Sequence, residues 1–247
     1  MTPSATATLL APTGVLRAGI NLSNFLLVTG RTDVGEPVGV APDLARAIAE
    51  RLGVATRYVT YPKPGELADA ADADAWDIGL IGAEPARAET ILFTPAYAEI
   101  QSTYLVPPGS SLQSVDEVDR PGLRIAVAAR TAYGLWLDRN IRHAELVRSD
   151  SLDASFEQFQ RDGLDVLAGL YPRLIADLAR MPGARILPGQ FAAVQQAVGT
   201  PRRNAQAAAF LRDFVAEAIS SGLVADLIAK HGVQGLSVAP PSGPGAP

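Results

Sequence analysis

Cysteine is absent from this 247-residue sequence, and histidine occurs only twice. Without thiols the chain forms no disulfide, performs no thiolate chemistry and holds no cysteine-ligated zinc. The two histidines, His143 and His231, stand far apart, with no spacing typical of a metal site. No phosphate-binding loop and no G-x-G-x-x-G sequence occurs either. We therefore expect neither a metal nor a bound cofactor.

Long apolar runs and blocks of basic residues are also missing. No run approaches the roughly 20 apolar residues that span a bilayer, so we expect no membrane span. The net charge of −5 and the lack of a Lys/Arg cluster argue against a nucleic-acid surface. Residues 1–14 have no basic segment and only Leu9 and Leu10 as an apolar core, unlike a secretory signal peptide. Either an export signal is missing from this sequence, or the protein stays in the cytoplasm.

Hydrophobic residues make up 48% of the chain, enough for the core of one large domain or two small lobes. Apolar runs at 15–20, 55–61, 77–81 and 99–106 read as strands, and Pro42–Leu52 reads as an amphipathic helix. A weaker Ala-rich helix is expected at 64–75. Strands that alternate with helices predict an α/β fold with a parallel sheet.

The same order of elements starts again after Pro107. Leu123–Val127 resembles Leu16–Ile20, and Leu164–Ala168 resembles Trp76–Leu80. Two similar α/β units in tandem predict two lobes. The remaining predicted helices lie at 132–140, 152–161, 172–180, 200–222 (with Thr200 and Pro201 as N-cap and first residue) and 223–231, and the remaining strands at 145–148, 184–187 and 192–198.

The stretch from Trp76 to Tyr97 is the most informative. A buried strand ends at Gly82, Glu84 and Pro85 begin a short helical turn, and Arg87 lies one turn further on. The chain then returns through 91–93 to a turn at 94–95. Such a strand end delivers a cation and backbone N–H groups to the edge where open α/β sheets bind small molecules.

Seven residues of this stretch match, in order and spacing, a known signature: Asp77, Pro85, Arg87, Phe93, Thr94, Pro95 and Tyr97. The chain thereby resembles the amino-acid-type (family 3) solute-binding proteins of ABC importers, over roughly residues 10–238. The resemblance implies a two-lobed fold of the type II periplasmic-binding-protein kind. Lobe 1 would be residues 1–106 plus 198–238, lobe 2 residues 107–197, and 239–247 a disordered tail. Two strands near 103–108 and 193–199 would form the hinge.

The resemblance assigns Arg87 to the α-carboxylate of a ligand, assisted by N–H groups around Gly82 and Ala83. The planar guanidinium suits a bidentate carboxylate contact. By position alone, Arg87 is instead a surface arginine paired with Glu84. Glu84 itself either binds a ligand ammonium or neutralises Arg87.

The loop after the first strand, with Asn21, Asn24 and Phe25, occupies the place of the family's ligand wall. The alternative for the two asparagines is turn chemistry. In the second lobe, Thr131 keeps the hydroxyl of the family's Gly-Thr-Thr turn at a helix N-terminus, either as an anion site or as an N-cap. Arg130 replaces the family glycine and adds a cation. We expect Tyr133 to reach the cleft too.

The clearest departure from the family lies after Asp165. The family has there an aspartate that holds the ligand's ammonium, whereas this chain has Leu170, followed by Tyr171. An apolar side chain does not pair with a buried ammonium. Either Glu84 takes over that role, or the ligand lacks an α-amino group.

The leading hypothesis is a monomeric solute-binding protein that closes on a small carboxylate-bearing ligand between its lobes and delivers it to an ABC permease. By resemblance it is periplasmic, with the cytoplasm as the alternative. A second hypothesis is an enzyme similar to cyclohexadienyl dehydratases, which place a catalytic glutamate where this chain has Arg173. A third is a cytoplasmic ligand sensor on the same scaffold.

Overall fold

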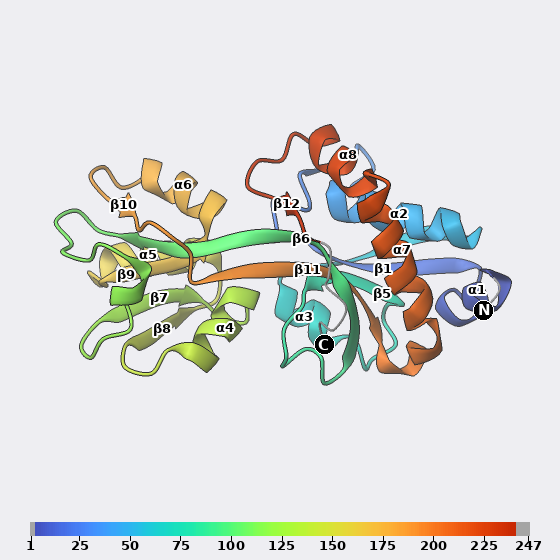
Figure 1. Ribbon diagram of the computed structural model, residues 1–247, viewed down its shortest axis with the longest axis horizontal. Coiled ribbons are helices and arrows are strands. Elements are labelled where there is room, and N and C mark those ends of the chain that lie inside the picture. The colour runs from blue at the N-terminus through green and yellow to red at the C-terminus, as the bar shows by residue number, and fades with distance from the viewer. Residues whose placement is uncertain (1–2, 241–247) are drawn as a thin grey trace. The chain divides into compact units, whose positions relative to one another are not determined.

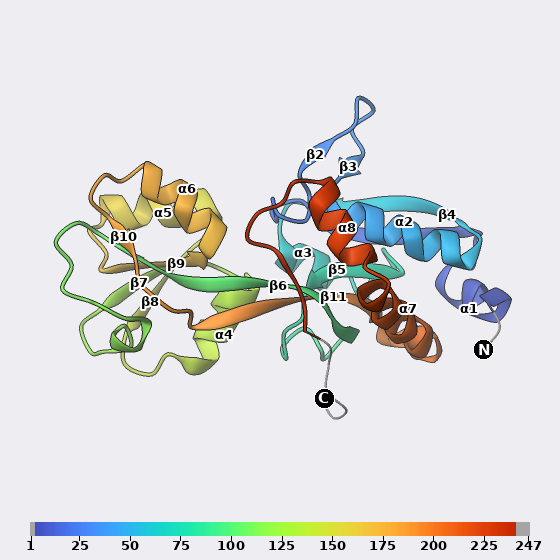
Figure 2. The same cartoon turned by 45° about the horizontal axis from the view of Figure 1, so that its top comes forward.

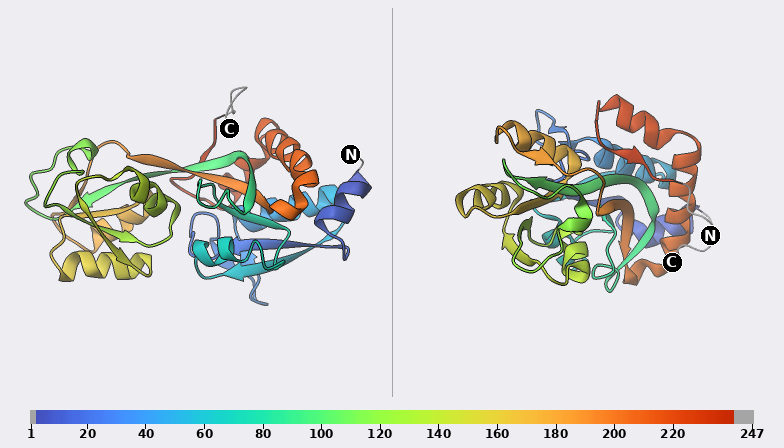
Figure 3. Two further views of the ribbon diagram at one scale, coloured as in Figure 1. Left: turned by 90° about the horizontal axis from the view of Figure 1, so that it is seen from below. Right: turned by 60° about the vertical axis from the view of Figure 1, so that its left-hand side comes forward.

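The computed structural model describes residues 3–240 and shows a mixed α/β fold with a large, mostly parallel sheet flanked by helices (Figure 1). The described chain forms two compact units. Unit 1 holds the residues up to Glu99 and those from Gln195 on, and unit 2 is Ile100–Val194. Both divisions fall inside strands that continue without a break (Figure 3). From the sequence, we expected the two boundaries between the lobes after Val106 and after Ala197.

Unit 1 contains three parallel strands in the order β4-β1-β5, followed by the antiparallel β11. Helices α2 and α8 of this unit lie side by side, and α2 packs on β1 and β4 (Figures 1 and 2). Its elements are α1 (Pro3–Leu10), β1 (Val15–Asn21), β2 (Gly30–Arg31), β3 (Pro37–Val38), α2 (Val40–Leu52), β4 (Ala55–Tyr61), α3 (Pro64–Asp69), β5 (Ile78–Gly82), the start of β6 (Ile91–Val106), the end of β11 (Ala192–Pro201), the 3₁₀ helix η2 (Arg202–Ala207), α7 (Ala208–Ser220), α8 (Leu223–Lys230) and β12 (Ser237–Val238).

Unit 2 repeats this plan with the parallel strands β9-β7-β8, and the antiparallel β6 beside β9. Its core includes Phe156, Phe159 and Leu164, all buried. Its elements are the end of β6, the 3₁₀ helix η1 (Val115–Glu117), β7 (Arg124–Ala128), α4 (Ala132–Asn140), β8 (Glu145–Ser149), α5 (Leu152–Arg161), β9 (Val166–Leu170), α6 (Tyr171–Ala179), β10 (Arg185–Ile186) and the start of β11.

The sequence similarity between the units corresponds to one shared contact. In unit 1, Asp77 N–H donates to the carbonyl of Arg17, and Arg17 N–H donates back to Asp77 Oδ2 at 2.8 Å. In unit 2, Asp165 and Arg124 make the same reciprocal pair, again at 2.8 Å. Each pair joins the residue before one strand to an arginine of its parallel neighbour, the third residue of β1 in unit 1 and the first residue of β7 in unit 2. The two contacts therefore set the parallel strand register in both units.

The side chains of these two pairs differ. Arg17 wraps its guanidinium around Asp77, with Nε 3.1 Å and Nη2 2.7 Å from the carboxylate, which is 3% exposed. Arg124 instead donates Nη2 to the carbonyls of Asp162 and Gly163, and its Nε lies 4.0 Å from Asp165. The Asp165 carboxylate is 38% exposed. One pair is thus a buried ion pair and the other mainly a backbone contact.

Three predicted local features are wrong. Thr94 and Pro95 lie inside β6 and not in a turn. Proline has no N–H to donate to the sheet, but Thr94 Oγ1 accepts a hydrogen bond from the Val198 N–H of the neighbouring strand at 3.2 Å and so keeps the two strands joined there. Thr200 is no N-cap: β11 runs on to Pro201, and the buried Thr200 hydroxyl donates to Asp77 O at 2.8 Å. Helix α3 ends at Asp69, well before residue 75.

Two chain ends also differ from expectation. Helix α1, which the sequence did not predict, buries Leu10 completely. Ala239, assigned to an unpacked tail, is 3% exposed, and its N–H donates to Tyr97 O at 3.1 Å. The rest of that tail, residues 241–247, lies outside the described residues.

The two Asp–Arg pairs give a matched test of these energetics. We expect Asp77→Ala to cost about 2 kcal/mol of unfolding free energy, because it removes the buried carboxylate from Arg17 and leaves that guanidinium only its ion pair with the exposed Asp74. Asp165→Ala removes mainly one backbone hydrogen bond and should cost about 1 kcal/mol. Urea denaturation of both variants measures the difference. Equal losses would contradict the contrast between the two pairs.

Candidate functional site

The carboxyl ends of β1, β4 and β5 meet at one edge of the sheet in unit 1. The parallel register pairs Asn21 with Tyr61 and Ile20 with Leu80, so these strands end side by side. The loop from Asn21 to Phe25 and the segment after Gly82 both leave from this edge. The structure therefore brings together the candidate residues that the sequence placed in the first unit, where open α/β sheets bind ligands.

The two asparagines of the first loop make the turn contacts that were their alternative role. Asn21 Oδ1 accepts from the N–H and hydroxyl of Ser23, and Asn24 Oδ1 accepts from Leu26 N–H at 3.2 Å. Phe25 follows them with its ring 40% exposed, a high value for a phenylalanine. The turn thus holds an apolar ring in solvent at the sheet edge.

The end of β5 provides fewer N–H groups than expected. Ala83 N–H donates to Gln195 O at 2.7 Å and so belongs to the sheet. Gly82 contributes its carbonyl, which accepts from Arg87 Nη1 at 2.6 Å. The predicted assistance from the Ala83 N–H is therefore wrong, because the antiparallel neighbour β11 uses that group.

Arg87 is 4% exposed, which corrects both expectations of an accessible residue. It lies in a turn in which Arg87 N–H donates to Glu84 O at 2.9 Å, and Glu84 is itself 9% exposed. The contact to Gly82 O fixes one corner of the guanidinium at the strand end. A buried arginine held in this way is preorganised, so little rotamer entropy is lost when it contacts an anion.

Tyr61 is a residue that the sequence reasoning missed. It ends β4 at the same edge, half-buried, and its carbonyl accepts from Leu22 N–H at 2.9 Å. Burial raises the pKa of its hydroxyl, so the group is neutral at physiological pH. The sequence did contain a signal for this residue. Tyr61 is the last residue of a predicted strand, and that strand runs parallel to the one that ends at Asn21.

In unit 2, the carboxyl ends of β7 and β9 meet in the same way, since Ala126 pairs with Leu167 in parallel register. Thr131 follows β7 and caps α4: its hydroxyl accepts from Gly134 N–H at 3.1 Å and donates to Ala128 O at 2.9 Å. Tyr133 is 3% exposed, and burial raises the pKa of its phenol to about 12. The expectation that Tyr133 reaches a cleft is wrong, because the first turn of α4 packs it inside unit 2.

Arg130 has a left-handed backbone, with φ of 59°. For a residue with a Cβ this conformation costs roughly 1 kcal/mol, and glycine avoids that cost. The side chain is exposed at the sheet edge. The turn therefore keeps the shape that the family glycine would give it, and strain of this kind concentrates at functional sites.

Leu170 and Tyr171 lie where β9 ends and α6 begins. Leu170 is 9% exposed and apolar, and no side chain caps the helix there. Tyr171 is 39% exposed. Each unit thus has one exposed aromatic ring at the carboxyl edge of its strands, Phe25 in unit 1 and Tyr171 in unit 2.

Neither a metal site nor a membrane span emerges from the described part of the chain. Within residues 3–240, no group of three or more His, Cys, Asp or Glu side chains is placed to hold a metal ion. In the same range, no helix is long and apolar enough to cross a membrane. In each unit, the candidate residues at the carboxyl ends of the strands include an arginine, Arg87 in unit 1 and Arg130 in unit 2, and an arginine suits an organic anion.

Comparisons with known proteins decide the family. The model of the bacterial extracellular solute-binding proteins, family 3, matches residues 20–234. The chain belongs to this family. No curated protein matches the sequence.

Solved structures of family-like proteins share the fold. A variant of ArgBP from T. maritima superposes with a TM-score of 0.73 at 20% identity, covering 93% of this chain and 100% of its own. A binding component of an ABC transporter from Wolinella succinogenes, complexed with lysine, gives 0.72 at 19%, covering 88% and 95%. The ancestral amino-acid-binding protein AncCDT-1, a precursor of cyclohexadienyl dehydratase, gives 0.71 at 19%, covering 90% and 98%.

Arg173, where the dehydratases would carry a catalytic glutamate, has a structural role in this solute-binding protein. Its Nε lies 2.9 Å from the buried Asp177 and its Nη2 2.7 Å from Asp153. Arg180 approaches the same two carboxylates. Arg173 is therefore held by carboxylates of α5 and α6 within unit 2.

The left-handed turn at Arg130 gives a test of the site. We expect Arg130→Gly to keep or raise thermal stability, because glycine adopts a φ of 59° without steric cost. If Arg130 contacts the ligand, the same change weakens ligand binding. Thermal unfolding and calorimetry on one variant separate the two effects. A variant that is less stable and binds normally would show that Arg130 serves the fold alone.

Proposed function

We propose that the protein captures a small carboxylate-bearing ligand, an amino acid or a related organic acid, for import by an ABC transporter. The proposal places it as a monomer in the periplasm, with a membrane permease as its partner. The observation that carries it is Arg87: a buried arginine, fixed by Gly82 O at the carboxyl end of β5, in the position that the family signature assigns to the ligand carboxylate. Membership of an extracellular binding-protein family supports the location.

The charge of Arg87 has a physical consequence. The guanidinium is 4% exposed, and its Nη1 donates to Gly82 O, which holds it at the strand end. A ligand carboxylate would supply the opposite charge with two parallel hydrogen bonds. In unit 2, the helix start capped by Thr131 adds a partial positive charge that favours the same kind of ligand.

Each unit offers an apolar surface to a ligand at the ends of its strands. In unit 1 Phe25 is exposed, and in unit 2 Tyr171 is exposed and Leu170 replaces a family carboxylate. Among the structural relatives, one is described as arginine-bound and another as complexed with lysine. Glu84, three residues before Arg87 and 9% exposed, is the acidic residue proposed to pair with a ligand ammonium.

A thermal-shift screen identifies the ligand class. Amino acids, hydroxy acids, keto acids and small dicarboxylates are added to the purified protein, and a compound at 100 times its Kd should add about 2.7 kcal/mol to the unfolding free energy. Amines and sugars without a carboxylate serve as controls. Stabilisation by a sugar with no response to any carboxylate would contradict the proposed ligand class.

Arg87→Met tests the carboxylate contact. The variant keeps an unbranched apolar stem and removes the charge, so we expect binding to weaken by about 3 kcal/mol, more than a hundredfold. The control is Arg202→Met, which removes another arginine of unit 1 that donates only to carbonyls, those of Ala88 and Glu89. Calorimetry with the best compound from the screen measures both. Equal affinity losses in the two variants would mean that Arg87 acts through the fold.

Glu84→Gln shows whether the ligand carries an ammonium. If it does, the variant should bind at least tenfold more weakly, about 1.4 kcal/mol. If the ligand lacks an amine, removing a negative charge near Arg87 should leave affinity unchanged or increase it. A common amino acid that binds tightly and is unaffected by Glu84→Gln would contradict both assignments of Glu84.

A further inference from the structure

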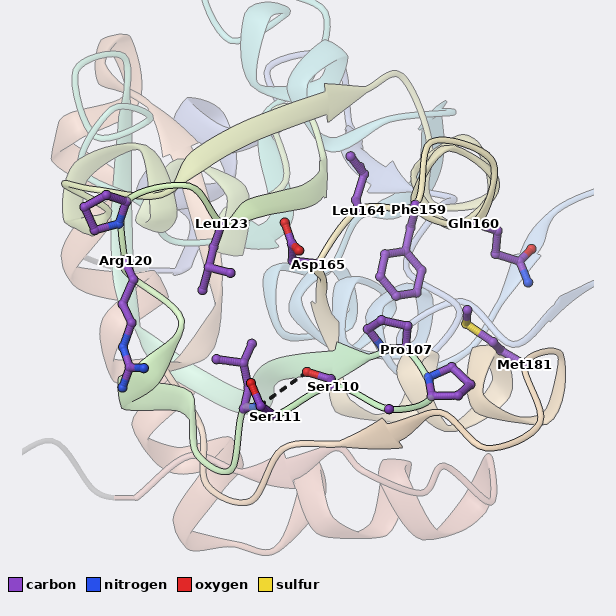
Figure 4. Close-up of a pocket in the computed structure, with 15 residues that line it drawn as sticks. Pro107, Ser110, Ser111, Arg120, Leu123, Phe159, Gln160, Leu164, Asp165 and Met181 are labelled. Carbon is purple, nitrogen blue, oxygen red and sulfur yellow. Dashed lines mark hydrogen bonds between the residues drawn. The ribbon is translucent and has the colours of Figure 1, made fainter.

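Unit 2 contains a groove of about 500 Å³ that lies apart from the candidate site (Figure 4). Its lining includes Leu123 and Asp165, which directly precede β7 and β9. The groove is therefore at the amino ends of these parallel strands, whereas Thr131 and Tyr171 follow their carboxyl ends. Five residues of strand separate the two edges, roughly 16 Å.

The groove has an apolar interior and a firmly held rim. Phe159, Leu164 and Leu123 line it from within, and Figure 4 shows them around the side chain of Asp165. The rim segment 107–112 is held by Arg185, whose Nη2 donates to the carbonyls of Ser110 and Leu112. A volume of this size and a fixed rim suit a small ligand.

The charge in the groove comes from Asp165. Its counterpart in unit 1, Asp77, is 3% exposed and bound by the guanidinium of Arg17. In unit 2, the guanidinium of Arg124 donates to the carbonyls of residues 162 and 163 and lies 4.0 Å from the Asp165 carboxylate, which is 38% exposed on the groove lining. The two units fold alike, and yet the aspartate carboxylate that is buried in unit 1 is exposed in unit 2.

The other charged residue of the lining, Arg120, does not neutralise Asp165. Its Nη2 lies 3.6 Å from Glu117, and Figure 4 shows its guanidinium pointing away from Asp165. Ser110, Ser111 and Gln160 add neutral polar groups. The interior thus combines a carboxylate with apolar side chains, which is complementary to an ammonium group carried on an apolar body.

We propose that this groove is a second binding site, separate from the one for transport, and that it takes a small organic ammonium ion with an apolar body. The ammonium contacts the Asp165 carboxylate, and the apolar body lies against the partly exposed Leu123 and Pro107 of the lining. The proposal does not depend on the identity of the transported ligand, because the two sites share no residue.

Amide NMR with benzylamine, which is protonated at neutral pH, tests the site on the whole protein. We expect saturable shifts at Ser110–Leu112 and at Leu164 and Asp165, and much weaker binding of the neutral analogue benzyl alcohol. Absence of saturable shifts, shifts confined to the carboxyl ends of the strands, or equal affinity for benzyl alcohol would each overturn the proposal.

Asp165→Asn keeps an oxygen for the Arg124 N–H and removes the charge, so benzylamine affinity should fall at least tenfold. Asp162→Asn is the matched control, since Asp162 pairs with Arg161 outside the groove lining, and should bind normally. If Asp165→Asn does not fold, Gln160→Lys serves as the second groove variant, since Gln160 is exposed on the rim. Its ammonium should repel the ammonium of benzylamine and abolish binding. Normal benzylamine binding by either groove variant would refute the site, whatever the transported ligand is.

Discussion

The reciprocal contact between an aspartate that precedes a strand and an arginine near the start of the neighbouring strand is the constraint on which the parallel pairing in both units depends. Asp77 with Arg17 and Asp165 with Arg124 fix the parallel register at the amino ends of the strands. Because strands in fixed register with similar lengths also end together, the loops after β1 and β5, and those after β7 and β9, start from common edges. The candidate ligand residues are close in space for this reason, although they are far apart in the sequence.

At these edges the structure departs from what stability alone would select. Arg130 has a left-handed backbone, and Phe25 and Tyr171 expose aromatic rings. Each feature costs free energy or solubility. In each unit these features lie at the carboxyl ends of parallel strands, where open α/β sheets bind ligands.

Much of the fold could be predicted from periodicity and from the repeat. The helices at 132–140 and 152–161 begin and end where expected, because Thr131 and Ser151 cap them and an apolar face follows. Features that depend on partners distant in sequence could not. Thr94 and Thr200 look like turn and cap residues locally, but each hydroxyl is bound to another part of unit 1.

In the candidate site, too, local features could be predicted from the sequence, whereas features that depend on partners distant in sequence could not. Its members and their positions at strand ends could be predicted from Asp77, Arg87 and Thr131, because motif and strand order are local in sequence. Which groups are accessible could not. Ala83 N–H is taken by β11, Tyr133 is packed inside unit 2, and Arg87 is buried, all through tertiary contacts that no local pattern encodes.

The central claim is that Arg87 holds the carboxylate of the transported ligand. The most direct measurement is the NMR signal of the Arg87 side-chain Nε–H, assigned by its loss in the Arg87→Met variant and followed during titration with the tightest carboxylate ligand. The account predicts a large, saturable change with the same Kd as calorimetry, as a bidentate hydrogen bond forms. A ligand that saturates the protein while the Arg87 signal stays unchanged would contradict it.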